Sequence, residues 1–294
     1  MIYPANINMT IRYHQISSSH KAKFYILLLM LVLPFYCYSQ DLYDMENSKK
    51  YAEYLFSGRQ YKLAAEEYER LVFFDSSNII FKLRLVKSYR LTGDLRSGIT
   101  QINSFYGINM PEPMAIEFVK LQLLSDSLKV VNDFLSLNNT ISPESKVIYQ
   151  SCDLLLSGDY KGADMLVKTS VVRNPSFPKN LISLSESAAR TKFKSPFIAA
   201  GFSSIIPGTG KFYTKNWADG IFSILFVAGN AWQSYRGFKE HGIKSAYGWA
   251  FGTLSASFYI GNIFGSAKAA RRYNLLRKNE IKNKTFEIVR SDNF

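Results

Sequence analysis

The stretch that decides the fold of the amino-terminal part is GRQYKLAAEEY, residues 58–68. In it a turn containing glycine precedes Tyr61, and a small residue, Ala64, stands three positions after the tyrosine. Tyr68 follows four positions later. Such a turn reverses the chain, the small residue lets a second helix approach the first closely, and the bulky residue fills the groove between neighbouring helix pairs. The stretch therefore predicts an antiparallel helix pair.

The same arrangement recurs twice along the chain. Gly93-Asp94-Leu95 is followed by Gly98 and Ile102, and Gly158-Asp159-Tyr160 is followed by Ala163 and Val167. Internal repetition of this kind is typical of stacked helical arrays. The predicted packing positions of the repeats are Gly58, Tyr61, Ala64, Tyr68, Gly93, Gly98, Gly158, Tyr160 and Ala163.

These repeats resemble the tetratricopeptide repeat family. Aligning Tyr61 with Leu95 gives a spacing of 95 − 61 = 34 residues, which is the period of that family. The resemblance covers about residues 45–178 as roughly four helix pairs, of which the third, about 113–140, lacks the turn motif. The predicted fold is all-α, with tetratricopeptide-like repeats over 40–178 and a small α-helical membrane domain after them. A non-repeat helical bundle is the alternative.

The first forty residues have the pattern of a targeting segment. Lys21 and Lys23 precede the apolar run Phe24–Tyr36, and the small residues Cys37 and Ser39 follow it. This is a charged region, an apolar region and a cleavage site, so 1–39 is predicted to be a signal peptide cut before Gln40. The alternative is an uncleaved signal anchor. After cleavage Cys152 is the only cysteine, so the mature chain has no intramolecular disulfide.

The composition changes after residue 178. Residues 179–194 are polar and are predicted to form a linker, and 195–275 are rich in glycine and apolar residues. Three apolar segments stand out in this region: 195–206, 220–235 and 247–267. The last has no charged residue over 21 positions, which is the length of a membrane-spanning helix, whereas the other two are short. Residues 276–294 form a basic tail.

The sequence PGTGKFY, residues 207–213, is not a phosphate-binding loop, because Ile205 stands where the first glycine belongs and Phe212 follows the lysine. With Trp217-Ala218-Asp219-Gly220 it resembles the P-G-x-G-[QK]-x-Y signature of a small helical membrane domain. That domain has no assigned activity and occurs in Gram-negative envelopes after tetratricopeptide-like repeats or beside membrane-protein insertion efficiency factors. The resemblance implies a membrane location and no reaction. The motif residues are Pro207, Gly208, Gly210, Lys211, Tyr213 and Gly220.

Small residues recur every four positions in the third apolar segment. One stripe comprises Gly248, Gly252 and Ala256, and another begins at Ser257. Such ladders allow close helix packing in lipid. The predicted packing residues are Gly252, Ala256, Gly261 and Gly265.

The formal net charge of +13 favours an anionic partner or surface. The densest basic stretch begins at Lys268, directly after the longest uncharged segment, so we expect anionic lipid headgroups near the C-terminal tail rather than nucleic acid. The expected location is the inner membrane of a Gram-negative-type cell envelope, with the repeats periplasmic. We expect the chain after residue 195 to cross the membrane three times, and two crossings are the alternative.

No catalytic, cofactor or metal constellation is found in the sequence. The predicted function is a non-enzymatic scaffold that binds a protein or peptide through the helical repeats. The alternative is an accessory component of membrane-protein biogenesis or transport that acts through its C-terminal domain. An enzymatic function is the third and lowest-ranked hypothesis.

Overall fold

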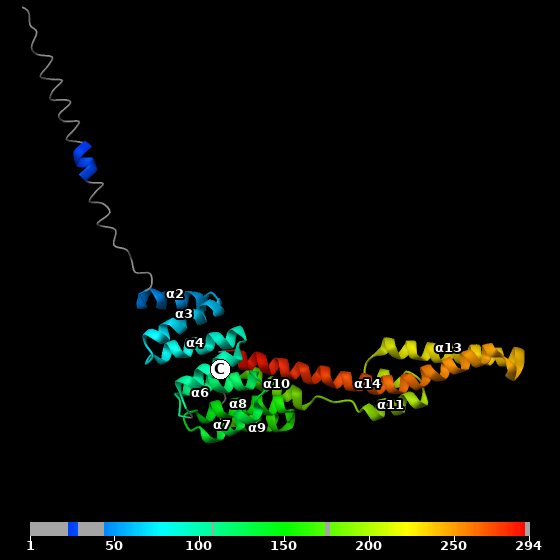
Figure 1. Ribbon diagram of the computed structural model, residues 1–294. Helices are drawn as coiled ribbons and strands as arrows, with labels where there is room; N and C mark the ends of the chain where they lie inside the picture. Colours follow the sequence, from blue (N-terminus) through cyan, green and yellow to red (C-terminus); the bar gives the residue numbers. More distant parts are fainter. Residues whose placement is uncertain (1–22, 29–43, 108, 174–176, 292–294) are drawn as a thin grey trace, which may run out of the picture.

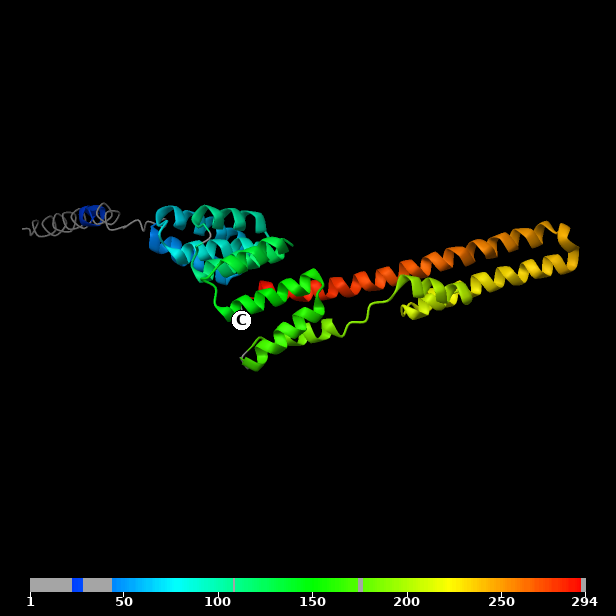
Figure 2. The same ribbon diagram turned by 90° about the horizontal axis from the view of Figure 1, so that it is seen from below.

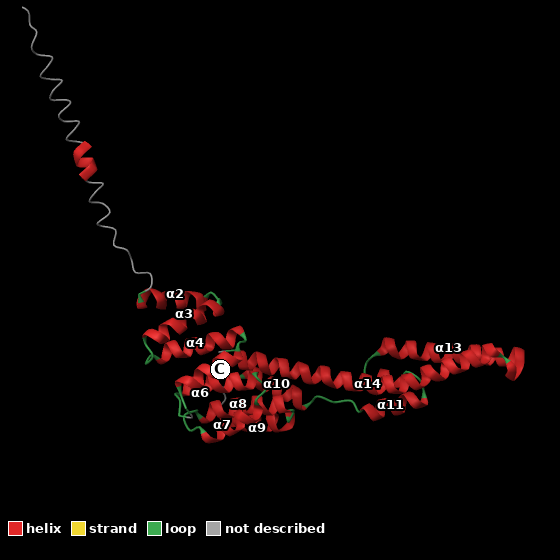
Figure 3. Cartoon of the chain, viewed as in Figure 1, coloured by secondary structure: helices red, strands yellow, loops and turns green. Residues whose placement is uncertain are grey.

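The structure is a computed structural model that describes residues 23–28, 44–107, 109–173 and 177–291. Within these ranges the chain is built from helices and the turns between them, without strands (Figure 3). The all-α prediction is confirmed. Of the predicted signal peptide only 23–28 is described, as a short exposed helix, and the predicted cleavage site lies outside the described residues.

The nine helices that the structure describes from Met45 to Ala189 form a first unit, which we call the repeat domain after the repeats predicted there, and eight of them lie in antiparallel pairs. The pairs are α2 (Met45–Ser57) with α3 (Tyr61–Phe74), α4 (Ile79–Thr92) with α5 (Leu95–Phe105), α6 (Glu112–Leu124) with α7 (Leu128–Leu137), and α8 (Pro143–Ser157) with α9 (Tyr160–Arg173). The ninth is α10 (Lys179–Ala189), which covers most of the predicted linker and packs on α9. The first helices of successive pairs also contact one another, in the order α4, α6, α8, α10, so they form one face of the array.

Local sequence accounts for where these helices begin. Asn78 caps α4, accepting hydrogen bonds from the backbone N–H groups of Ile80 and Phe81. Ser142 caps α8 in the same way, with Pro143 at the first helical position. Both are favourable arrangements, because a side-chain oxygen satisfies an N–H that has no partner within the helix, and proline has no N–H to satisfy there.

The remaining helices form a second unit, which we call the hairpin unit. It comprises α11 (Pro196–Ile205), α12 (Thr209–Tyr213), α13 (Trp217–His241) and the 45-residue α14 (Ala246–Arg290). A short 3₁₀ turn, Gly242–Lys244, joins α13 to α14 at the tip. Figures 1 and 2 show from two directions that α13 and α14 project away from the repeat domain as a long antiparallel pair. Helices α11 and α12 pack against α14 nearer to the repeats.

Helix α14 also belongs to the repeat domain. It runs without a break through the predicted boundary at 275–276 and ends against α6, α8 and α10, the first-helix face of the array. Ile281, Ile288 and Val289 are buried in the same core cluster as Leu121, Leu155 and other repeat residues. The segment predicted as a basic tail therefore supplies part of the hydrophobic core.

None of the helices in the described parts of the chain is both long enough and apolar enough to cross a membrane. The prediction that 247–267 is a spanning helix is therefore wrong. The segment is long enough and uncharged, but Gly248, Ser255, Gly261 and Asn262 are among many small and polar residues that lower its mean hydropathy.

Candidate functional site

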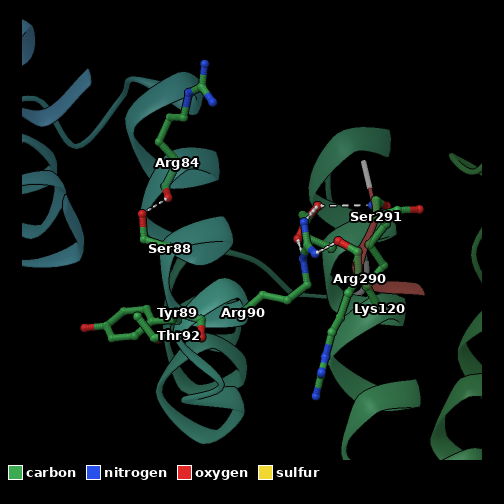
Figure 4. A network of polar contacts seen from close by, with 9 residues as sticks. Arg84, Ser88, Tyr89, Arg90, Thr92, Lys120, Arg290 and Ser291 are labelled. Carbon is green, nitrogen blue, oxygen red and sulfur yellow. Dashed lines mark hydrogen bonds and ion pairs between the residues drawn. The ribbon is translucent and has the colours of Figure 1, made fainter. Parts of the chain in front are cut away.

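The carboxyl end of α14 is held by a cluster of buried charges on the first-helix face. Arg90 on α4 is 1% exposed, and its Nε donates to Oε2 of Glu117 on α6 at 2.6 Å. Lys120 Nζ lies 3.8 Å from Glu117 Oε1. Figure 4 shows Arg90 and Lys120 converging on the end of α14, where Arg90 Nη1 donates to the carbonyl of Arg290 at 2.7 Å and Lys120 Nζ to that of Ser291 at 3.3 Å.

The electrostatics of this cluster explain its composition. The last carbonyls of a helix have no partners within it and carry a partial negative charge, which nearby cations stabilise. Arg90 and Lys120 place two cationic groups beside those carbonyls. The array therefore binds a helix end, and that end belongs to its own chain.

The predicted repeat-packing residues lie where close contact is needed. Ala64 and Ala163 are fully buried, and Tyr68 is 1% exposed. A Cβ atom added at Gly98 would meet the side chain of Leu121 on α6 at 3.1 Å, so this glycine admits the next helix pair. Tyr61 and Tyr160 are half-buried at the starts of α3 and α9.

The turn residues fall into two classes. Gly93 and Gly158 adopt the left-handed backbone conformation, with φ of 86° and 93°. Each precedes an aspartate that caps the next helix. In the first pair Gly58 has a negative φ of −75°, and Arg59 is the residue with a positive φ, of 59°. The third pair uses this second geometry, with Asp126 at φ 61°. Because no glycine marks that turn, the sequence pattern could not find it.

The glycines of the 207–220 motif are sites of close packing. Gly208 is left-handed with φ 91°, and an added Cβ would lie 2.3 Å from the carbonyl oxygen of Gly220. At Gly210 an added Cβ would lie 1.9 Å from the carbonyl oxygen of Ala199 on α11, and at Gly220 it would lie 2.2 Å from the ring of Phe212. Gly208 and Gly210 admit only glycine, because a Cβ would collide with backbone atoms, and at Gly220 the Phe212 ring would have to move. Together they pack α11, α12 and the start of α13 into one compact joint.

The other motif residues surround this joint. Pro207 is half-buried in the loop after α11. The hydroxyl oxygen of Tyr213 accepts a hydrogen bond from the backbone N–H of Ser195 at 3.3 Å, and Lys194 Nζ lies 4.4 Å from the centre of its ring. Lys211 Nζ donates to Ser223 Oγ on α13 at 2.7 Å.

The predicted small-residue stripes of α14 are only partly at helix contacts. An added Cβ at Gly252 would lie 2.9 Å from Ser234 Oγ, and one at Gly265 would lie 3.7 Å from Lys211 Cε. Ala256 and Gly261 are exposed, and nothing lies within 4 Å of a Cβ added at Gly261. For these two residues the predicted packing role is wrong.

The buried stripe of α14 lies on a different face and begins with a different spacing. It comprises Gly248, Ser255, Asn262, Ser266 and Ala270. Seven residues drift by only about 20° around a helix, whereas a four-residue repeat drifts away from its starting face more rapidly. Ser266 shares a hydrogen bond of 2.7 Å with Ser203 on α11, and Ser255 Oγ donates to the carbonyl of Val227 on α13 at 2.9 Å. The seven-residue interval from Gly248 through Ser255 to Asn262 was the signal that the four-residue pattern missed, and the stripe continues at four-residue intervals through Ser266 to Ala270.

The hairpin unit has a reversed polarity relative to the repeat domain: its small and polar side chains are buried and its large apolar side chains are exposed. Over residues 196–275, alanine is the largest apolar side chain that is buried, as at Ala199 and Ala270. The large ones point outward, with Phe197 86%, Ile205 78% and Phe264 72% exposed. The repeat domain, by contrast, buries leucine, isoleucine and aromatic side chains.

Comparison with protein-family models, with curated proteins and with solved structures finds no match for the chain.

Proposed function

We propose that this protein is a non-enzymatic scaffold of a Gram-negative-type cell envelope. The hairpin unit attaches it to the membrane. Its repeat domain lies on the periplasmic side and binds a protein or peptide partner. As part of this proposal we assign the helix pairs to the tetratricopeptide type and the hairpin unit to the P-G-x-G-[QK]-x-Y type of membrane domain.

The observation that carries the proposal is the reversed polarity of the hairpin unit. In lipid, helices associate through small residues and hydroxyl groups while large apolar side chains face the acyl chains. The contacts of Ser203 with Ser266 and of Ser234 with the carbonyl of Gly248, at 2.7 and 2.8 Å, fit this pattern. A soluble protein that exposed so many large apolar side chains on one unit would need a partner to cover them.

Charge placement supports the same attachment. Residues 220–235 of α13 and 246–267 of α14 are free of charged side chains and lie side by side in the hairpin. Basic residues lie at both ends of this apolar band, with Arg236, Lys239 and Lys244 at the tip and Lys268 at the other end. Such residues favour anionic headgroups at a membrane surface.

The partner surface is expected on the first helix pair. The end of α14 already covers part of α6, α8 and α10. Tyr51 and Tyr54 on α2 and Phe73 and Phe74 on α3 are at least half exposed. Exposed aromatic side chains are enriched at protein interfaces, so we expect a peptide with apolar side chains to bind there.

Membrane attachment is tested by co-flotation of the purified chain with vesicles containing anionic phospholipid. The triple variant Leu225→Ser, Trp232→Ser, Phe264→Ser removes outward apolar side chains from the hairpin unit, and we expect it to stay at the bottom of the gradient. The control triple, Leu137→Ser, Met165→Ser and Val172→Ser, changes equally exposed residues of the repeat domain and should float like the parent. Equal behaviour of the two triples would overturn the proposal.

Partner binding is tested by crosslinking and mass spectrometry on native membranes. We expect crosslinks from the first helix pair to one recurrent protein. The variant Tyr54→Ser, Phe73→Ser should lose these crosslinks while its flotation with vesicles is unchanged. Crosslinks that survive in this variant would refute the assigned surface.

A further inference from the structure

A cavity of about 300 Å³ lies between α12, α13 and α14, on the side of the motif joint that faces the hairpin tip. Its walls carry a cation, Lys211, a carboxylate, Asp219, and an amide, Asn262. Three aromatic side chains, Phe222, Phe226 and Phe258, line the rest together with serine hydroxyls and Gly261. The packing of the helices therefore leaves a space whose lining is both charged and apolar.

Asn262 is the residue that packing does not explain. It is only 5% exposed, and within the described part of the chain neither its Oδ1 nor its Nδ2 has a hydrogen-bond partner. An unpartnered buried amide costs about 1–3 kcal/mol for each polar group, so such groups are uncommon in folded proteins and require an explanation. Asn262 is one of the residues that line the cavity, and a small movement of its covered side chain would give the amide a partner in a molecule bound there.

The two charged groups face the same cavity without pairing. Lys211 Nζ donates to Ser223 Oγ at 2.7 Å, and Ser223 Oγ in turn donates to the backbone carbonyl of Asp219 at 2.7 Å. Among the described residues no carboxylate lies within 4 Å of Lys211 Nζ, and the Asp219 carboxylate accepts from Asn216 Nδ2 at 2.6 Å. An ammonium has three donors, so Lys211 retains donors for an anion.

The position of the cavity along the hairpin selects the class of ligand. Lys211 packs beside Gly265, near the end of the uncharged stretch of α14, and Lys268 follows within one turn. The charged wall of the cavity thus lies where the apolar band meets the basic base of the hairpin. In a membrane-attached protein this is the level of phospholipid headgroups, and the aromatic walls extend from it along the acyl chains.

We propose that this cavity binds a phospholipid headgroup that contains both a phosphate and a primary ammonium, as in phosphoethanolamine lipids. The phosphate accepts hydrogen bonds from Lys211 Nζ and Asn262 Nδ2, and the ammonium donates to the Asp219 carboxylate. The acyl chains run along Phe222, Phe226 and Phe258. This inference rests on the proposed membrane attachment, because a membrane is what presents such a lipid to the hairpin unit.

The test is thermal unfolding of the full chain in maltoside micelles with added lipid. Phosphatidylethanolamine should raise the Tm, and phosphatidylcholine, whose quaternary ammonium has no N–H to donate, should raise it less. Lys211→Gln removes the charge that pairs with the phosphate, and we expect it to weaken lipid binding at least about tenfold, because a charge-assisted hydrogen bond is the stronger kind. Asp219→Asn should bind both lipids and lose the preference for ethanolamine.

Asn262→Leu separates ligand binding from packing. Leucine has nearly the shape of asparagine and removes the unpartnered amide, so we expect a higher Tm without lipid and no further rise with phosphatidylethanolamine. The matched control is Asn230→Leu on α13, whose amide donates to the carbonyl of Phe226 outside the cavity lining, and it should keep the lipid response.

Three outcomes would overturn the proposal. They are equal shifts with phosphatidylethanolamine, phosphatidylcholine and phosphatidylglycerol, an unchanged lipid response in Asn262→Leu, and an equal shift with soluble phosphoethanolamine, which would identify a free solute instead of a lipid. The vesicle flotation described above is independent of these shifts. Flotation that persists in Lys211→Gln separates loss of the headgroup site from loss of membrane attachment.

Discussion

Arg90, Glu117 and Lys120 show how single residues join the two units of the molecule. Their charged groups are almost completely withdrawn from water, with side-chain exposures of 0%, 2% and 5%. Burying an ion pair rarely stabilises a fold by itself, because desolvation offsets much of the attraction. Here the same groups also satisfy the carbonyls at the end of α14, so the cluster is specific for a helix end placed on this face of the array.

The buried pair is tested by a double-mutant cycle in chemical denaturation. Arg90→Leu leaves Glu117 buried with only the more distant Lys120 as a counter-ion, and we expect the free energy of unfolding to fall by about 3–5 kcal/mol. The double variant Arg90→Leu, Glu117→Leu should recover much of this loss because no unpaired carboxylate remains. A double variant as unstable as the single one would mean that the pair contributes mainly through its bonds to α14.

Ala64 is the residue-scale test of the helix-pair contact. It is fully buried between α2 and α3, so Ala64→Leu overpacks the site and should lower the free energy of unfolding by about 1–3 kcal/mol. Glu66→Leu, on the exposed side of the same helix, is the control and should change it by less than about 0.5 kcal/mol. Similar losses for both variants in chemical denaturation would contradict the packing.

At the scale of the helix, the glycines of the hairpin unit separate into those that pack and those that do not. Gly210→Ala would drive a Cβ into the backbone of α11, so we expect the joint to open and the Tm to fall by several degrees. Gly261→Ala adds a methyl group where nothing lies within 4 Å, and it should be neutral or stabilising by up to about 1 kcal/mol, because alanine favours helix. Equal Tm values for the two variants would argue against the joint.

The sequence pattern found the helix pairs wherever a glycine turn and a small residue recur together, as at Gly158 and Ala163. It missed the third turn because Asp126 adopts the left-handed conformation that glycine usually supplies. It also placed the packing stripe of α14 on Gly261 and Ala256, since composition shows which residues are small but does not show which face a long helix presents to its neighbour.

Contacts between segments that are far apart along the chain could not be predicted from the sequence. Residues 276–290 are rich in lysine and arginine, which suggested a basic tail near lipid headgroups. Ile281, Thr285 and Ile288 nevertheless form a narrow stripe that the repeat domain buries. The buried partners on α4 and α6 are about 170–200 residues away along the chain. Nothing local in the sequence connects Arg90 with Arg290. The same holds for the cavity at Asn262, whose lining comes from three separate helices.

At the scale of the whole molecule, α14 is the element that fixes the hairpin unit to the repeat domain. With 45 residues and a rise of about 1.5 Å per residue, it extends about 68 Å from the hairpin tip to the buried charge cluster. The other connection is the segment after α10, where the Asn274 side chain exchanges two hydrogen bonds with the backbone of Lys194. A partner of the kind proposed above would thereby be held at a set distance from the hairpin tip.

These two connections between the units lead to the last prediction. Spin labels at Lys129→Cys on α7 and Glu240→Cys near the hairpin tip, in a Cys37→Ala, Cys152→Ala background, should give one narrow distance distribution by pulsed electron paramagnetic resonance. Ile288→Asp with Val289→Asp places two carboxylates in the core and should release the end of α14, because burying an unpaired charge is costly. The distribution should then broaden, since the segment after α10 is the remaining connection. Asn283→Ala, on the exposed face of the same helix, should leave it narrow. A narrow distribution in the double aspartate variant would show that the orientation of the hairpin is set by the contacts of Lys194 and Asn274 instead.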